Sequence, residues 1–168
     1  MRPVRIGTSG WHYSHWRGLY YPLSVSPRAM LNYYARDFDT VEINNSFYRL
    51  PSIHTFDAWN RSTPDGFCFA VKASRFLTHL RKLLDPQPAL DRLMEATAGL
   101  GPKLGPILFQ LPPHWHCDLN RLTAFLRALP AGRRYCIKFR GQSWHNRRVF
   151  ALLREQNVAF CIYELVGF

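Results

Sequence analysis

The sequence predicts an α/β protein built as a TIM-type (β/α) barrel that is incomplete, with about six of the usual eight strands. Strand-like and helix-like segments alternate along the 168 residues, and the connections between them are short. This order is typical of a parallel sheet with helices outside it. The glycine fingerprints of open nucleotide-binding sheets, GxGxxG and GxxxxGK[ST], are absent, which favours a barrel over a doubly wound sheet.

The strand-like segments are short runs rich in β-branched and aromatic residues. They cover residues 4–9, 40–44, 67–72, 106–111, 135–139 and 158–163, and helix-like segments cover 27–38, 52–61, 88–98, 119–129 and 146–156. Pro27 suits the first position of its helix after Ser26, and Asp118 suits the N-cap of another. With no linker or repeat in view, residues 1–168 are expected to form one barrel domain that lacks its C-terminal strands.

Composition limits the class of protein. Hydrophobic residues make up 47% and charged residues 20%, as in ordinary globular proteins. No apolar run approaches the roughly 20 residues that span a bilayer, and no signal-peptide pattern opens the chain. We therefore expect a cytoplasmic protein without membrane contact.

The chain is strongly basic, with 22 Lys and Arg against 11 Asp and Glu and a net charge of +11. Such a charge attracts phosphates, either of nucleic acid or of a small metabolite. The basic residues are scattered rather than gathered in a tail, so a merely basic surface is the simpler interpretation.

Polar side chains recur at the ends of the predicted strands. Successive side chains of a strand point to opposite faces, so Glu42 and Asn44 share one face, away from Val41 and Ile43. Buried parallel strands are normally almost wholly apolar, and barrel enzymes build their sites at the carboxyl ends of the strands. The residues placed in this way are Glu42, Asn44, Lys72, Gln110, Lys138, Arg140 and Glu164, with Ser9, Trp11 and His12 beyond the first strand.

These residues predict a site at the barrel mouth, although satisfied polar layers inside a barrel are the alternative. Glu42 and Lys72 are the candidate catalytic residues: Glu42 as general acid or base, and Lys72 as its counter-charge, as a phosphate or carbonyl ligand, or as a Schiff-base amine. The candidate substrate-binding residues are Ser9, Trp11, His12, Asn44, Tyr48, Gln110, Arg140 and Glu164. The aromatic members suit either core packing or stacking on a ring of the ligand.

Histidines suggest a metal site only weakly. His114 and His116 flank Trp115 after the fourth strand, and with His12 and Glu42 they could in principle bind a metal ion. That arrangement needs three loops to converge, and exposed loop histidines are commoner. We therefore predict neither a metal nor a cofactor.

Several longer motifs run through the chain. They are Gly7-Thr8-Ser9-Gly10-Trp11, Trp16-Arg17-Gly18, Thr40-Val41-Glu42-Ile43-Asn44, Phe47-Tyr48-Arg49-Leu50-Pro51, Phe69-Ala70-Val71-Lys72-Ala73, Phe109-Gln110-Leu111-Pro112-Pro113, Ser143-Trp144 and Phe160-Cys161-Ile162-Tyr163-Glu164. This set of motifs resembles the YecE-like family (domain-of-unknown-function family 72). The resemblance covers essentially the whole chain. It implies a barrel related in shape to sugar isomerases, and it does not imply a reaction.

The chain departs from this family in two ways. The family usually has Glu at the position of Lys138, and His or Asp at the position of Gly141. Its members also continue through two further strands, so the resemblance implies a shortened barrel with an open edge. We expect such a chain either to be inactive or to need a partner, such as a second copy, over the gap.

Three functions follow as hypotheses. The first is an enzyme that acts on a small polar or phosphorylated metabolite through Glu42 and Lys72 at the barrel mouth. The second is a basic nucleic-acid-binding protein. The third is an inactive, shortened member of the family.

Overall fold

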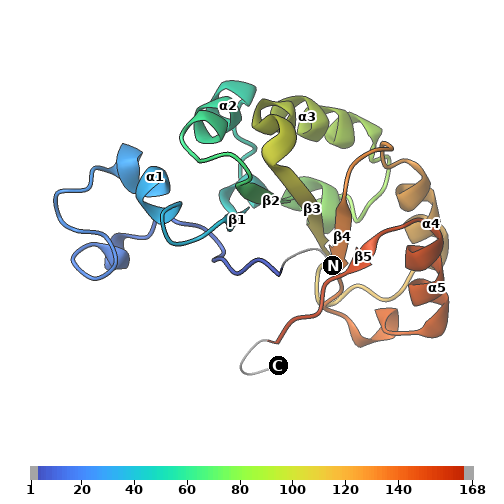
Figure 1. Ribbon diagram of the computed structural model, residues 1–168. Helices are drawn as coiled ribbons and strands as arrows, with labels where there is room; N and C mark the ends of the chain where they lie inside the picture. Colours follow the sequence, from blue (N-terminus) through green and yellow to red (C-terminus); the bar gives the residue numbers. More distant parts are fainter. Residues whose placement is uncertain (1–3, 165–168) are drawn as a thin grey trace. The chain divides into compact units, whose positions relative to one another are not determined.

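The computed structural model describes residues 4–164, which form two compact units (Figure 1). The first unit comprises residues 4–71 and 94–105, and the second comprises residues 72–93 and 106–164. The boundaries between the units fall inside three elements: the strand Cys68–Lys72, the helix Gln87–Thr97 and the strand Leu104–Gln110. The prediction of a single domain stays a prediction.

The chain is an α/β protein, as predicted. The helices are α1 Met30–Tyr34, α2 Ile53–Arg61, α3 Gln87–Thr97, α4 Leu119–Arg127 and α5 Arg147–Glu155; the strands are β1 Thr40–Ile43, β2 Cys68–Lys72, β3 Leu104–Gln110, β4 Tyr135–Lys138 and β5 Ala159–Phe160. The strands form a parallel sheet in the order β1-β2-β3-β4-β5, which is not closed within residues 4–164. No helix in that part of the chain has the length and apolar character to cross a membrane.

Two predicted strands differ from the structure. Residues 4–9 form no strand: Thr8 alone makes a bridge to Val41, while Val4 and Ile6 are exposed without a strand to cover them. The last predicted strand, 158–163, is reduced to β5. Its pairing with β4 ends one residue later, where the Cys161 amide donates to the Ile137 carbonyl at 2.8 Å.

Side chains of the strands alternate as the sequence predicts. In β1 and β2, Val41, Ile43, Phe69 and Val71 are buried, whereas the residues between them are half-buried. In β4, Ile137 is buried between two half-buried residues. The polar residues of the strands therefore lie on the less buried face of the sheet.

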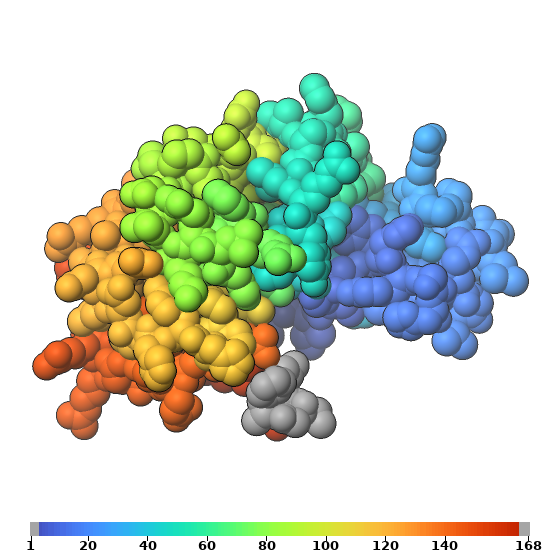
Figure 2. All heavy atoms as spheres, turned by 180° about the vertical axis from the view of Figure 1, so that it is seen from behind, coloured from blue at the N-terminus to red at the C-terminus, as the bar shows by residue number. Residues whose placement is uncertain are grey.

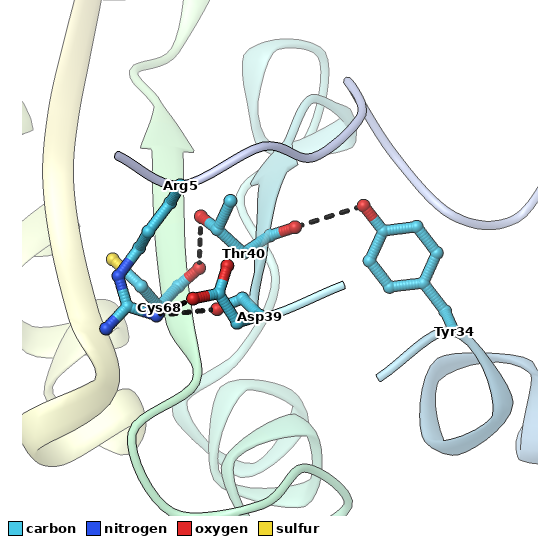
Figure 3. A network of polar contacts seen from close by, with 5 residues as sticks. All are labelled: Arg5, Tyr34, Asp39, Thr40 and Cys68. Atoms are coloured by element: carbon cyan, nitrogen blue, oxygen red, sulfur yellow. Dashed lines mark hydrogen bonds and ion pairs between the residues drawn. The ribbon is translucent and has the colours of Figure 1, made fainter. Parts of the chain in front are cut away.

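A polar network secures the start of β1 in the first unit (Figure 3). The Tyr34 hydroxyl donates to the Thr40 carbonyl at 3.0 Å, and the Thr40 hydroxyl donates to the Cys68 carbonyl at 2.8 Å. Arg5 binds both the backbone carbonyl and the carboxylate of Asp39. These bonds tie helix α1 and the amino-terminal ends of strands β1 and β2 together.

A buried lysine stabilises the carboxyl end of α2. Lys103 Nζ donates to the carbonyls of Asn60 at 2.6 Å and Thr63 at 2.7 Å, and its side chain is 8% exposed. Carbonyls at a helix end have no partner within the helix and carry partial negative charge. Lys103 therefore supplies both hydrogen bonds and a favourable charge.

We expect Lys103→Met to lower the free energy of unfolding by about 2 kcal/mol, because the Asn60 and Thr63 carbonyls both lose the ammonium donor. Methionine keeps most of the packed volume, so the loss isolates the polar contribution. Urea unfolding followed by circular dichroism measures it, with exposed Lys82→Met as the matched control. Equal stabilities of the two variants would contradict the assigned role.

The second unit packs α4 and α5 against β3, β4 and β5. Phe109 of β3 meets Phe125 of α4 edge to face at 4.9 Å, and Phe150 of α5 meets Phe160 of β5 at 5.2 Å. The predicted cap is confirmed, since the Asp118 side chain accepts from the Arg121 amide at 2.9 Å. The cap thus fixes where the loop after β3 ends and α4 begins.

Candidate functional site

A pocket of about 320 Å³ lies in the first unit, between the loop that follows residue 8 and the segment after β1. It is lined by Gly10, Trp11, His12, Tyr13, Asn44, Asn45 and Tyr48. Four of these residues, Trp11, His12, Asn44 and Tyr48, are predicted from the sequence as substrate-binding residues. The structure brings them together, whereas their role in binding stays a prediction.

Hydrogen bonds between residues close in sequence shape the loop on one side of the pocket. The Thr8 hydroxyl donates to the Gly10 carbonyl at 2.6 Å, and the Tyr13 hydroxyl donates to the Ser9 carbonyl. Gly10 has a φ of 102°, which L-residues rarely adopt, and a Cβ there would lie 2.9 Å from the Tyr13 hydroxyl oxygen. A glycine is thus needed for the loop to close on Tyr13.

Trp11 forms a fixed wall of the pocket. Its side chain is 9% exposed and meets Trp59 of α2 edge to face at 5.1 Å. Its carbonyl accepts from the buried Tyr21 hydroxyl at 2.6 Å. Tyr48, by contrast, is 71% exposed and stands at the rim. Trp11 therefore contributes to core packing, whereas the exposed ring of Tyr48 suits stacking on a ligand.

Asn44, one of the residues that line the pocket, has an unsatisfied acceptor. It follows β1 directly, where the chain turns into a short 3₁₀ helix, Asn45–Phe47, and the Ser46 hydroxyl donates to the Ile43 carbonyl at 2.9 Å. The Asn44 side-chain oxygen, Oδ1, is buried and has no hydrogen-bond partner within residues 4–164. Nearly all buried polar atoms are hydrogen-bonded, and an unpaired one costs about 1–3 kcal/mol.

Glu42 lies beside this pocket without lining it. Its carboxylate accepts from the Ser9 hydroxyl at 3.0 Å, and its amide donates to the Thr8 carbonyl at 3.0 Å. Two predicted site residues, Ser9 and Glu42, are thus in direct contact. Glu42 lies in β1, two residues before Asn44 of the pocket lining.

The remaining predicted residues belong to the second unit. Lys72 ends β2, Gln110 ends β3 in register with Lys138 of β4, and Arg140 lies two residues beyond β4; all four are half-buried. Lys138 Nζ lies 4.0 Å from the ring centre of Tyr163 in a cation–π contact. Glu164 is exposed at the end of the described chain.

The histidine loop after β3 forms its own pocket of about 230 Å³ in the second unit. His114, Trp115 and His116 line it together with residues 141–143. His114 and His116 are both exposed. Within residues 4–164, no group of three His, Cys, Asp or Glu side chains is placed to hold a metal ion.

Sequence reasoning missed two residues of the first pocket, Tyr13 and Asn45. Neither lies at a strand position whose alternation predicts it. A chemical signal was present only in their residue types.

Known proteins resemble the whole of this sequence. The family model described as "Protein of unknown function DUF72" matches residues 5–166. The UPF0759 protein YunF of Bacillus subtilis is 29% identical over 168 residues, which cover 94% of this chain and 56% of that protein. The UPF0759 protein YecE of Escherichia coli K12 is 28% identical over 138 residues, which cover 82% and 48%. The chain therefore spans about half the length of these curated relatives.

Solved structures show the same fold. A DUF72 family protein of Thermotoga maritima matches with a TM-score of 0.80 and 27% identity, over 93% of this chain and 63% of that one. A DUF72 family protein of Enterococcus faecalis matches with a TM-score of 0.72 and 16% identity, over 93% and 61%, which supports the fold alone. As its motifs predicted, the chain belongs to the DUF72 family.

Proposed function

We propose that this chain forms part of an enzyme that acts on a small polar metabolite, which binds in the pocket of the first unit. One observation carries the proposal: Asn44, a residue of the pocket lining, has a buried side-chain oxygen, Oδ1, that finds no hydrogen-bond partner within residues 4–164. A ligand that donates a hydroxyl or N–H to this oxygen removes the cost of burying it.

The pocket walls indicate the kind of ligand. A volume of about 320 Å³ is at the lower end of the usual range for ligand sites, which suits a single ring rather than a polymer. Trp11 offers a fixed apolar surface, and Tyr48 at the rim offers a face for stacking. His12 and Asn45 add polar groups around these surfaces. A polyhydroxylated ring or a nucleoside fits this combination.

Glu42 is the proposed general acid or base. The 3.0 Å hydrogen bond from Ser9 holds one carboxylate oxygen and leaves the other oxygen to take or give a proton. Lys72 belongs to the other unit, so its predicted pairing with Glu42 stays a prediction.

We further propose that the sheet is part of a (β/α) barrel. The parallel strands follow one another in chain order with helices between them, as in that fold. The likeness to the Thermotoga maritima protein covers almost all of this chain. In a barrel, the segments after β1 and β2 belong to the face where active sites are built.

Replacing Asn44 with alanine is expected to weaken ligand binding at least tenfold, since one hydrogen bond to a buried acceptor is lost. The same change should leave the melting temperature unchanged or higher, because it removes a buried unpaired oxygen. NMR titration with D-glucose, D-ribose and adenosine at millimolar concentration, alongside thermal unfolding, measures both effects.

Asn120→Ala is the matched control, because Asn120 is exposed on α4. Failure of all three compounds to bind the unaltered chain would contradict the proposal. So would a lower melting temperature of Asn44→Ala with undiminished affinity. Any conversion of a bound compound, followed by NMR, should disappear in Glu42→Gln, which preserves the shape of the side chain. Binding of nucleic acid through the net positive charge stays a prediction.

A further inference from the structure

The loops after β3 and β4 form the pocket of about 230 Å³ in the second unit. Residues 113–116 come from the loop that follows β3, and residues 141–143 come from the loop that follows β4. Ligands of α/β proteins bind beyond the carboxyl ends of parallel strands, in open sheets and in barrels alike. The segment between β3 and α4 lies at the surface and is yellow in Figure 2. A pocket in this place is therefore a candidate for ligand binding.

Contacts between the two loops hold the pocket in shape. The Cys117 amide donates to the Ser143 hydroxyl oxygen at 2.9 Å, and Trp144 Nε1 donates to the Trp115 carbonyl at 2.7 Å. The two tryptophan rings also meet edge to face, with centres 4.9 Å apart. Gly141 allows this close approach, because a Cβ there would lie 3.1 Å from the Trp115 carbonyl oxygen. The pocket is thus preorganised, which lowers the entropic cost of binding.

Backbone acceptors of the pocket residues are already in use. The Gln142 carbonyl accepts from the His145 amide at 3.0 Å, and the Ser143 carbonyl accepts from the Asn146 side chain at 2.9 Å. The Trp115 carbonyl accepts the indole N–H described above. In the described part of the chain, the residues that line this pocket include neither Asp nor Glu. The pocket therefore offers few acceptors to a ligand.

Donors, by contrast, are available to a ligand. The Ser143 hydroxyl oxygen accepts from the Cys117 amide, so the hydroxyl proton is left to donate. The Gln142 side chain is exposed and carries two N–H donors. His114 and His116, which are also exposed, each carry at least one ring N–H. Because donors outnumber acceptors and the chain has a net charge of +11, the pocket favours an anion with oxygen acceptors.

We propose that this pocket binds a small organic carboxylate, with Gln142 and Ser143 donating to the carboxylate oxygens. Hydrogen bonds to an ionised acceptor are about twice as strong as those between neutral groups. The half-buried side chains of Pro113 and Trp115 supply apolar surface for the rest of the ligand. A volume of about 230 Å³ lies below the usual range for ligand sites, so the ligand holds at most a single ring. The site shares no residue with the pocket of the first unit and is independent of the proposed function.

Sodium benzoate is the suitable probe, because it joins one carboxylate to one apolar ring. Benzyl alcohol has the same ring without the charge, and sodium chloride at equal ionic strength controls for the added salt. The test is an NMR titration of the whole chain at neutral pH. We expect saturable binding of benzoate with shifted signals of His114, His116 and Trp115. Benzyl alcohol should bind at least tenfold more weakly, because it lacks the ionised acceptor.

Gln142→Glu keeps the shape of the side chain but places a negative charge beside the ligand. We therefore expect it to lower the affinity for benzoate at least tenfold. Asn157→Asp makes the same chemical change at an exposed position after α5 and should bind benzoate like the unaltered chain. Ser143→Ala removes one donor and should weaken binding about tenfold, with exposed Ser24→Ala as its control. If Ser143→Ala fails to fold in thermal unfolding, Gln142→Glu still decides, because Gln142 is exposed.

Equal affinity of Gln142→Glu and Asn157→Asp for benzoate would overturn the proposal, as would equal binding of benzoate and benzyl alcohol. A titration to millimolar benzoate without saturable binding would have the same consequence. Displacement of benzoate by sulfate would indicate a site for inorganic oxyanions and would overturn the ligand class. Asn44→Ala should leave benzoate binding intact, which separates failure of this site from failure of the first pocket.

Discussion

Replacing Trp144 with alanine is expected to lower the free energy of unfolding by about 3–5 kcal/mol, the usual loss for a fully buried aromatic residue. Trp144 is 0% exposed and stacks on Phe139 with ring centres 5.1 Å apart. It also meets Trp115 edge to face at 4.9 Å and donates from Nε1 to the Trp115 carbonyl at 2.7 Å. Its loss opens a cavity and leaves a carbonyl without its donor. Urea unfolding followed by far-ultraviolet circular dichroism measures the effect.

Trp144→Phe separates the contribution of aromatic packing from that of the hydrogen bond to the Trp115 carbonyl. Phenylalanine keeps the stacked contact with Phe139 but has no N–H, so we expect a loss of about 1–2 kcal/mol. The loop that carries Trp115 should then move, and NMR of His114 and His116 would detect the change. Alanine and phenylalanine variants of equal stability would show that packing contributes little here.

Replacing Gly99 with alanine is expected to cost about 3 kcal/mol, at the upper end of the range for overpacking. The added Cβ would meet the Ile53 carbonyl oxygen, and it would lie 2.8 Å from the Asp57 amide and 3.1 Å from Phe56 Cβ. Two of these neighbours are backbone atoms of α2 and cannot rotate away. The turn at residues 98–103 must therefore separate from α2, although the two pack closely in the first unit.

Thermal and urea unfolding of Gly99→Ala measure this cost. Ala98→Ser is the matched control, because it also adds one heavy atom to the same turn but at an exposed position. We expect the control to stay within about 0.5 kcal/mol of the unaltered chain. A stable Gly99→Ala variant would mean that α2 and the turn can move apart at little cost.

The candidate site was partly predictable because the carboxyl ends of parallel strands lie at one edge of a sheet. Asn44 follows an alternating apolar strand, so its place at the carboxyl edge could be predicted from the sequence. Trp11 and His12 were predicted in the same way, although the first strand did not form as expected. Tyr13 was missed, because its place in the pocket depends on its hydroxyl reaching back to Ser9.

The sequence by itself determined the order of helices and strands, the alternation of buried side chains in β1 and β2, and the cap at Asp118. These features depend on hydrogen bonds and periodicities within a few residues, which local sequence encodes. Only the tertiary structure decided that residues 4–9 form no strand and that Lys103 is buried at the end of α2. It also decided that Asn44 Oδ1 finds no hydrogen-bond partner within residues 4–164. Each of these depends on which distant segment supplies or withholds a hydrogen bond, and no local pattern specifies that partner.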